Sequence, residues 1–449
     1  MDERELRREI AKCNRCGQCR AVCPSFLDSI SEGDVARGRV MMVKGLLEGW
    51  LEANPEVDEA LSRCLACRSC FRECPGGVPV DRIVVAGRLL LTRKRGLSAG
   101  KRVVTRGLLL RPSLVERLLG LAGMVQRLAF ERLPADSGLR LRLPLPGMAA
   151  GRIVPPLAPR PFRQTLSSWL RVDNPVARVL YFTGCTTNYL YPEIGQAAVD
   201  TLRARGVEVI IPPGQRCCGI PALLAGDEET ARALARANLE EFGRYRADAL
   251  VVNCPTCLMA WKEEYLSLAG GGAATARELA AKACDYSQVA ELIEWKTPAG
   301  WKAPIEGRVK GPAGGIAPQA GAPGRSDAPI RVAYHDPCHH LALGIKDSPR
   351  YLLGLVPGAE LVEMPGPARC CGFAGSFSLR HYDLASRIGD RRVEQVKAAG
   401  PDLVVTSCPG CVLHLRDTIY RHRLPYRVMH LAQLVAGEPF RTGARAAGS

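Results

Sequence analysis

The chain has 449 residues, so it is too long for one hydrophobic core and we expect two or three domains. Its composition, 47% hydrophobic and 24% charged, is typical of a globular protein and excludes a disordered or membrane-embedded chain. The net charge of +16 is compatible with binding to a nucleic acid, a membrane surface or an acidic partner, and equally with a protein surface that is merely solvated. No helix-turn-helix or zinc-finger pattern favours nucleic acid, and we expect none to be bound.

The segments that decide location are the charged start of the chain and its most apolar stretch. The start lacks the pattern of a secretory signal. Residues 107–130 are interrupted by charged side chains and a proline, so they do not predict a membrane span. We therefore expect a cytoplasmic protein, with or without association at the cytoplasmic face of the membrane. Its nineteen cysteines then indicate metal binding or catalysis rather than disulfides.

Two four-cysteine runs near the N-terminus have the same spacing. The sequences CNRCGQCRAVCP and CLACRSCFRECP start at Cys13 and Cys64, and every cysteine recurs 51 residues later. The spacing is that of bacterial ferredoxins with two [4Fe-4S] clusters, in which the fourth cysteine of each run binds the other cluster. We therefore predict two cubane clusters rather than zinc or disulfides. The predicted ligands are Cys13, Cys16, Cys19 and Cys74 for cluster 1, and Cys64, Cys67, Cys70 and Cys23 for cluster 2.

A connector is expected to follow these runs. Apolar residues at helical spacing predict an amphipathic helix over Ser113–Leu133, and a proline-rich run over 142–162 predicts an extended segment. The helix is a candidate docking element for a partner or a membrane surface. Packing against the protein's own domains would explain its apolar face as well.

The later cysteines, with one exception, belong to a larger repeat. Each copy has a single cysteine, then a Cys-Cys-Gly turn, then a Cys-Pro-x-Cys turn, and the copies are displaced by 153 or 154 residues. Cys284 falls outside both copies and is interpreted as a buried apolar residue or a surface bystander. The first copy contains Cys185, Cys217, Cys218, Cys254 and Cys257, and the second contains Cys338, Cys370, Cys371, Cys408 and Cys411.

Strands and helices alternate in each copy. This pattern predicts a small parallel α/β sheet per copy, with cysteines just after strand ends, where open α/β folds bind ligands. The expected fold class is α+β multidomain, with a helical two-cluster ferredoxin-like domain followed by two α/β cysteine-rich domains. The predicted boundaries are 1–96 for the ferredoxin-like domain, 97–175 for the connector, 176–295 for the first cysteine-rich domain, 296–329 for a Gly/Pro/Ala-rich linker, and 330–449 for the second cysteine-rich domain.

Five cysteines per copy exceed what one tetrahedral zinc ion or one cubane requires. Adjacent cysteines are cramped as ligands of a single ion, and they suit a cluster in which neighbouring sulfurs bind different irons. Gly219 and Gly372 follow the pairs and would permit a turn that a side chain prevents. We therefore expect one inorganic centre per copy, here termed the first and the second centre.

At this point the chain resembles a known family. The segments RCCGIPA, YHDPCH and RCCGFAGSF, together with the ferredoxin runs, are similar to blocks of glycolate oxidase iron–sulfur subunits. The same "CCG" domain occurs in heterodisulfide reductase B and D subunits. The resemblance implies a noncubane [4Fe-4S] cluster in each five-cysteine set, with zinc or an ordinary cubane in one of them as an open alternative. It also implies an FAD-binding partner that oxidises a 2-hydroxy acid such as glycolate or D-lactate.

The chain has no G-x-G-x-x-G motif for a flavin or nicotinamide, so we do not expect it to be active alone. We expect an electron-transfer subunit of an oxidoreductase, relaying electrons from the FAD subunit to a quinone or redox protein. The alternative is a heterodisulfide-reductase-type subunit whose clusters reduce a disulfide. A structural zinc scaffold would leave the ferredoxin runs without purpose. No residue is assigned a catalytic role, and the histidines near Cys338 are either satisfied loop residues or residues that tune the cluster or deliver protons: His335, His339 and His340.

Overall fold

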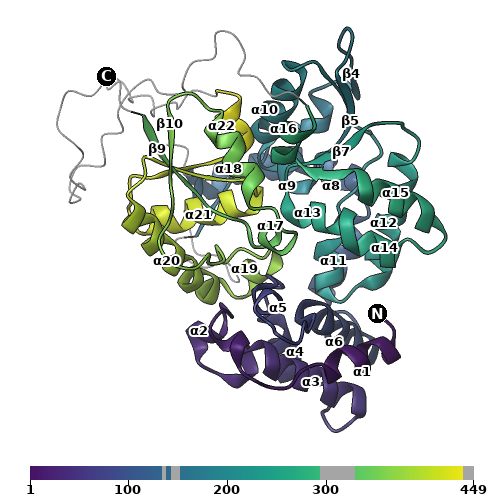
Figure 1. Cartoon of the computed structure of the whole chain (residues 1–449). Coiled ribbons are helices and arrows are strands. Elements are labelled where there is room, and N and C mark those ends of the chain that lie inside the picture. The colour runs from purple at the N-terminus through teal and green to yellow at the C-terminus, as the bar shows by residue number, and fades with distance from the viewer. Residues whose placement is uncertain (134–137, 143–151, 294–328, 438–449) are drawn as a thin grey trace.

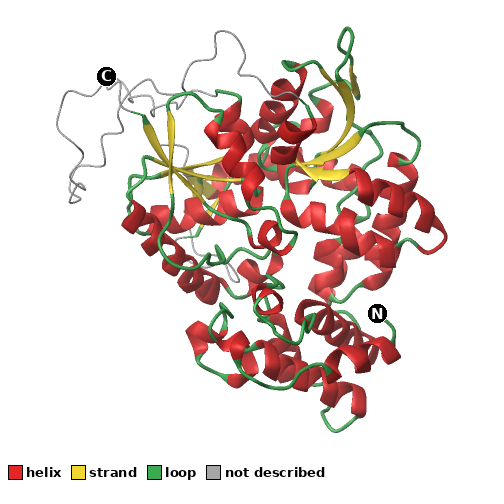
Figure 2. Cartoon of the chain, in the orientation of Figure 1, coloured by secondary structure: helices red, strands yellow, loops and turns green. Residues whose placement is uncertain are grey.

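The computed structural model describes residues 1–133, 138–142, 152–293 and 329–437. Figure 1 shows a helical N-terminal unit in purple and two units built on sheets, one in teal and one in yellow-green. All strands in Figure 2 lie above the N-terminal unit, which consists of helices and loops. The predicted linker, except for its last residue, and residues 143–151 of the proline-rich run lie outside the described residues.

Four helices form the body of the N-terminal unit. Asp2 and Asn54 cap two of them by accepting backbone N–H groups three residues later, at 2.7 and 2.9 Å. The apolar faces meet in a core that includes the fully buried Val43, Leu61 and Ile83. The four helices are α1 (Glu3–Ala11), α3 (Ala36–Glu48), α4 (Pro55–Ser62) and α6 (Val80–Arg95), and the short turns are η1 (Gln18–Arg20), α2 (Phe26–Ser29), η2 (Glu32–Asp34) and α5 (Ser69–Arg72).

The connector is helical at first and then forms a small antiparallel sheet in the order β1-β2-β3. The predicted helix over Ser113–Leu133 is too long, because Phe130 adopts extended backbone and pairs with Leu141. Among the side chains of α8 that the structure describes, three apolar ones are exposed, and the docking role of the helix stays a prediction: Leu118, Val125 and Leu128. The elements are α7 (Ala99–Arg102), η3 (Val103–Leu109), α8 (Pro112–Ala129), β1 (Phe130–Arg132), β2 (Leu139–Leu141), β3 (Ile153–Val154) and η4 (Phe162–Gln164).

The first cysteine-rich unit has a five-stranded sheet in the order β4-β6-β5-β7-β8. The short edge strand β4 runs antiparallel to β6, and the other neighbours are parallel. The strands are β4 (Trp169–Leu170), β5 (Ala177–Phe182), β6 (Val207–Ile210), β7 (Ala249–Val252) and β8 (Ala283–Asp285). The helices and short turns are α9 (Cys185–Tyr189), α10 (Pro192–Arg203), α11 (Ile220–Ala225), α12 (Glu228–Phe242), α13 (Pro255–Met259), η5 (Ala260–Glu264), α14 (Tyr265–Leu268), η6 (Gly270–Gly272), α15 (Ala273–Lys282), η7 (Tyr286–Gln288) and α16 (Val289–Leu292).

The second cysteine-rich unit has four parallel strands in the order β10-β9-β11-β12. Both sheets confirm the predicted α/β class, and their central strands are almost fully buried, as expected when helices cover both faces. The strands are β9 (Ile330–Tyr334), β10 (Ala359–Val362), β11 (Leu403–Thr406) and β12 (Arg427–His430). The helices are α17 (Cys338–Ala342), α18 (Asp347–Gly354), α19 (Ser376–Arg380), α20 (Tyr382–Ala399), α21 (Pro409–Arg421) and α22 (Leu431–Val435).

The two cysteine-rich units contact each other reciprocally. Helix α10 packs against α22, and α18, the counterpart of α10, packs against α16, the counterpart of α22. Likewise α13 contacts α17, while α21 contacts α9. Such exchanged pairs are the pattern of a two-fold axis, here between two halves of one chain. A single apolar core runs through this interface and includes Tyr181 and Val251 of the first unit and Tyr334 and Val405 of the second.

Membrane insertion has no support in the described helices, since none combines the length and apolarity needed to cross a bilayer.

Candidate metal centres

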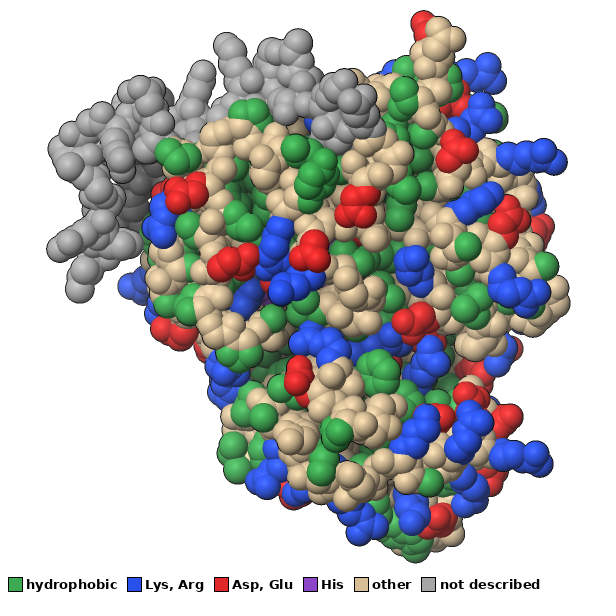
Figure 3. All heavy atoms as spheres, in the orientation of Figure 1, with side chains coloured by type: hydrophobic (Ala, Val, Ile, Leu, Met, Phe, Trp, Pro, Cys, Tyr) green, Lys and Arg blue, Asp and Glu red, His purple; other side chains and the backbone are tan. Residues whose placement is uncertain are grey.

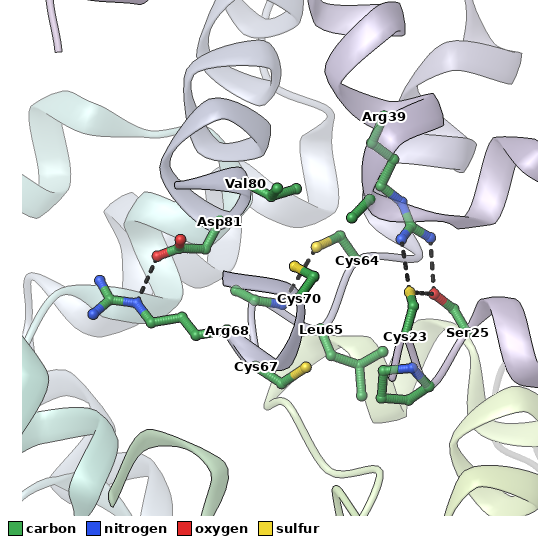
Figure 4. A pocket seen from close by; sticks show the side chains of 13 residues that line it. Cys23, Ser25, Arg39, Cys64, Leu65, Cys67, Arg68, Cys70, Val80 and Asp81 are labelled. Carbon is green, nitrogen blue, oxygen red and sulfur yellow. Dashed lines mark hydrogen bonds and ion pairs between the residues drawn. The ribbon is translucent and has the colours of Figure 1, made fainter. Parts of the chain in front are cut away.

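The four cysteines predicted for cluster 2 surround one cavity. Cys64, Cys67 and Cys70 come from one loop and α5, whereas Cys23 reaches the cavity from the other run (Figure 4). Burial raises the pKa of Cys70 well above its usual value, and its neighbours Cys67, Cys64 and Cys23 raise it further. Buried thiolates in such a group require positive charge close by, which iron supplies. The donor set therefore fits a [4Fe-4S] cluster.

Charged side chains border the same cavity. Arg39 is 1% exposed and donates to Cys23 Sγ at 3.9 Å and to Ser25 Oγ at 3.1 Å. On the other side, Arg68 Nε donates to the Asp81 carboxylate at 2.7 Å (Figure 4). A buried guanidinium beside a ligand sulfur stabilises the negative charge of thiolates.

The cysteines predicted for cluster 1 lie nearer the surface. Cys16 is exposed, and Cys13, Cys19 and Cys74 are partly buried. Burial raises the pKa of Cys19, and its neighbours Cys23 and Cys13 add to this effect, while the backbone of Arg37 opposes it. Cys74 follows α5, which contacts η1, the element that carries Cys19. The structure thus brings the two runs together as the prediction requires, and the assignment of ligands to each cluster stays a prediction.

The second centre consists of thiols packed against one another inside the second unit. Cys371 Sγ and Cys411 Sγ are 3.2 Å apart. The Cys338 and Cys371 thiols hold the pKa of Cys370 well below its usual value despite burial. Conversely, the Cys370 thiol, burial and further thiols raise the pKa of Cys338. Cysteine sulfurs packed together at such distances form a soft donor set suited to iron or zinc.

The first centre repeats this arrangement. The Cys217 and Cys257 thiols lower the pKa of Cys218 to about 6 against the effect of burial. Cys185 interacts with Cys217, and this contact together with burial raises the pKa of Cys185. All five predicted cysteines of the copy therefore converge on one place through three loops, each of which follows a strand of the sheet.

The two cysteine-rich centres meet at equivalent residues. The Cys257 thiol lowers the pKa of Cys254, but the Cys408 thiol of the other unit and burial raise it to about 12. In turn the Cys254 and Cys411 thiols hold the pKa of Cys408 well below its usual value. Cys254 and Cys408 open the Cys-Pro-x-Cys turns of their copies, so the contact lies across the two-fold axis.

The cluster 2 loop lies against the second centre. Burial and then the neighbouring Cys370 raise the pKa of Cys67 to about 12. Leu65 and Cys67 belong to one buried apolar cluster with Cys370, Phe377 and Ile388 of the second unit. The cysteine groups thus form an unbroken series from the N-terminal unit through the second centre to the first.

His339 fixes the point where the three units meet. Its Nε2 donates to the carbonyl oxygen of Ala66 in the cluster 2 loop at 3.0 Å, since that oxygen only accepts. Its Nδ1 then accepts from Thr256 Oγ1, within the Cys-Pro-x-Cys turn of the first unit, at 2.9 Å. His339 is therefore a satisfied residue that joins three loops, a role visible only in three dimensions.

The other residues flagged by the sequence have clear surroundings. Cys284 lies in the core between the sheets at 9% exposure, which confirms the interpretation as a buried apolar residue. His340 Nε2 lies 2.9 Å from Asp285 Oδ2, a buried contact between the two cysteine-rich units. Asp336, the neighbour of His335, is assigned no role from the sequence and accepts hydrogen bonds from Arg350 at 2.8 and 3.0 Å. No pattern in the sequence pointed to Arg39 or Arg68.

We expect Gly372→Ala to disturb the second centre more than Gly219→Ala disturbs the first. Both glycines have left-handed backbone, at φ 97° and 85°, which costs any side chain about 1–2 kcal/mol. A Cβ on Gly372 would lie only 2.4 Å from the Ala385 oxygen, whereas on Gly219 the nearest atom is the Ala231 oxygen at 3.3 Å. Iron content after anaerobic purification and the thermal midpoint would measure the difference. Equal losses at both positions would contradict this expectation.

Comparison with known proteins identifies both cysteine patterns. The family described as "4Fe-4S dicluster domain" matches residues 9–78, and the family described as "Cysteine-rich domain" matches residues 179–262 and 332–416. The chain is 28% identical over 451 residues to the probable glycolate oxidase iron-sulfur subunit of Bacillus subtilis, covering 97% of this chain and 94% of the relative. It is 30% identical over 262 residues to lactate utilization protein A of Geobacillus kaustophilus, covering 58% of this chain and 98% of the relative. It is also 29% identical over 265 residues to one subunit of the fumarate reductase (CoM/CoB) of Methanothermobacter marburgensis, covering 59% of this chain and 47% of the relative.

Proposed function

The chain belongs to the family of glycolate oxidase iron–sulfur subunits, which join a 4Fe-4S dicluster domain to two cysteine-rich domains, and on this basis we propose that it carries electrons for a flavin-dependent dehydrogenase. The resemblance drawn from the cysteine motifs is thereby confirmed. In this proposal an FAD-binding partner oxidises a 2-hydroxy acid, glycolate or D-lactate. The present chain conducts the electrons to a quinone or a redox protein.

The observation that carries the proposal is the unbroken series of cysteine groups. It runs from the exposed Cys16 at the surface to buried members such as Cys67, at 8% exposure, and Cys371, at 4%. Iron–sulfur clusters held by these groups would supply one-electron transfer. The surface at Cys16 is then the place where electrons enter. The surrounding chain buries inner cysteines such as Cys67 and Cys371 and so protects clusters bound there from water and oxygen.

Exposed basic residues are close in the sequence to the cysteines at the proposed point where electrons enter. Lysine and arginine side chains are frequent on the visible face of the N-terminal unit (Figure 3). Four exposed bases lie close to the cluster 1 cysteines in the sequence: Lys12, Arg15, Arg20 and Arg72. An acidic surface on the partner would be steered toward this face, since complementary charge accelerates association.

A second candidate function is reduction of a disulfide substrate at the cysteine-rich centres. It is favoured by the contact between Cys254 and Cys408, which places the two centres side by side, and by the similarity to one subunit of a fumarate reductase (CoM/CoB). In that function the electrons would leave at the two-fold axis instead of passing to a quinone or a redox protein.

We expect the purified full chain alone to show no glycolate or D-lactate oxidation with a dye acceptor, and to gain activity only with a co-purified flavoprotein. Tagged protein would be isolated anaerobically from its own cells, and its partners would be identified by mass spectrometry and flavin absorbance. Substrate oxidation by the flavin-free chain would contradict the proposal. Reduction of a mixed thiol disulfide, without any 2-hydroxy-acid activity in the complex, would favour the second candidate.

A further inference from the structure

The two cysteine-rich units differ at one position beside their centres. The position three residues before the first cysteine holds Phe182, the last residue of β5, in one copy and His335, directly after β9, in the other. Phe182 is fully buried and packs against the rings of Phe242 and Trp261, with centroids 5.8 and 5.5 Å away. His335 is equally buried, at 1% exposure, but brings a polar ring to the same place.

The ring of His335 lies against the second centre. One of its nitrogens and the Sγ atoms of Cys371 and Cys411 all lie within 4.8 Å of one another. Its Nδ1 is held by Arg392 Nε at 2.9 Å, and Nε2 has no hydrogen-bond partner among the described residues. Arg392 is itself buried and fixed by Gln395 Oε1 at 2.8 Å. The free ring nitrogen is therefore Nε2, and the sulfur atoms of Cys371 and Cys411 lie beside the ring that carries it.

The contact with Arg392 decides which ring nitrogen carries the proton. A guanidinium only donates, so Nδ1 of His335 accepts and the proton of the neutral ring lies on Nε2. A metal bond through Nε2 would then leave the ring with no proton at all. The tautomer therefore makes His335 a donor toward sulfur and not a metal ligand.

We propose that, when the second centre holds its cluster, His335 donates from Nε2–H to a sulfur of that centre and makes its reduction potential higher than it would be without this donor. The proposal rests on the proposed electron-transfer function. Donors to ligand sulfurs stabilise the more negative, reduced state, and Phe182 provides no donor to the first centre. Clusters held at the Cys67 group and at the second centre would supply the donor and the acceptor of one electron, and no bond or proton would change place in that transfer.

The test is a redox titration of the anaerobic, fully loaded chain, followed by electron paramagnetic resonance. The signal of the second centre is the one lost in Cys371→Ser. His335→Phe, which copies the first unit, is expected to retain its iron. The equilibrium constant for reducing this centre should fall about tenfold, a downward shift of about 59 mV for one electron. His335→Gln, which keeps an N–H donor, should restore the potential to within about threefold of the wild-type equilibrium constant.

The control is His422→Phe, a histidine bound to Asp390 at the far end of α21, which should leave every signal in place. An unshifted potential in His335→Phe would overturn the proposal. So would zinc at the second centre, or loss of its iron in both the Phe and the Gln variants, which would identify a ligand. Because the titration uses no partner and no substrate, its outcome is independent of whether the complex oxidises glycolate.

Discussion

Replacing Cys70 by serine is expected to remove about four iron atoms per chain and to stop electron transfer into the cysteine-rich units. Cys70 lines the cavity between the exposed cluster 1 group and the second centre, and three further cysteines face the same space. A hydroxyl is a poor ligand for iron that binds thiolates. Iron and sulfide analysis would measure the loss, and stopped-flow reduction would measure the electron transfer.

Cys284→Ser is the matched control for this experiment. Cys284 lies outside every cysteine group, in the core between the sheets, so the same substitution should leave the iron content unchanged. Equal iron loss in both variants, or a full iron complement in Cys70→Ser, would contradict the assignment of cluster 2.

The second large effect is expected from Arg68→Met, at the interface between the N-terminal unit and the first cysteine-rich unit. Arg68 is 5% exposed and binds Asp81 and Glu263 at 2.7 Å and Glu264 at 3.5 Å. Removing it leaves the buried Asp81 and the mostly buried Glu264 without this partner, while Glu263 keeps Arg82 at 3.0 Å, and the loss costs about 3–5 kcal/mol. Hydrogen exchange of α5 and η5 should accelerate about a hundredfold or more, since each 1.4 kcal/mol is about tenfold.

Arg93→Met provides the comparison. Arg93 pairs with Glu228 across the same two units at 3.2 Å, but its side chain is 69% exposed. Exposed pairs contribute about 1 kcal/mol or less, so exchange should change little. If both variants accelerate exchange equally, the buried network does not hold the units together.

Contacts between residues far apart in the chain could not be predicted from the sequence, whereas local patterns could. The spacing around Cys13 and Cys64 predicts the dicluster domain because three of the four predicted ligands of each cluster are close in the sequence, and the alternation of strands and helices predicts both sheets. The end of α8 at Ala129 was missed, because Phe130 is held in a strand by Leu141, a residue that helical periodicity does not consider.

The contact of Cys254 with Cys408 was equally hidden, since the two lie 154 residues apart and meet only through the two-fold packing. The difference between Phe182 and His335 is visible when the copies are aligned. Its meaning depends on Arg392, which approaches from α20, 57 residues further along the chain. Local spacing therefore predicts the groups of cysteines, and tertiary packing decides how they are joined.

The buried cluster that joins Leu65 and Cys67 to Phe377 and Ile388 has a consequence for biogenesis. In the folded chain these apolar contacts lie between the cluster 2 loop and the second unit. At the same interface, His339 donates a hydrogen bond to the carbonyl oxygen of Ala66. An iron–sulfur carrier that delivers a preformed cluster needs open access to Cys67. We therefore expect the N-terminal unit to be loaded while it is still undocked. The interface would then set the order of maturation: cluster 2 is inserted first, and the N-terminal unit packs against the second cysteine-rich unit afterwards.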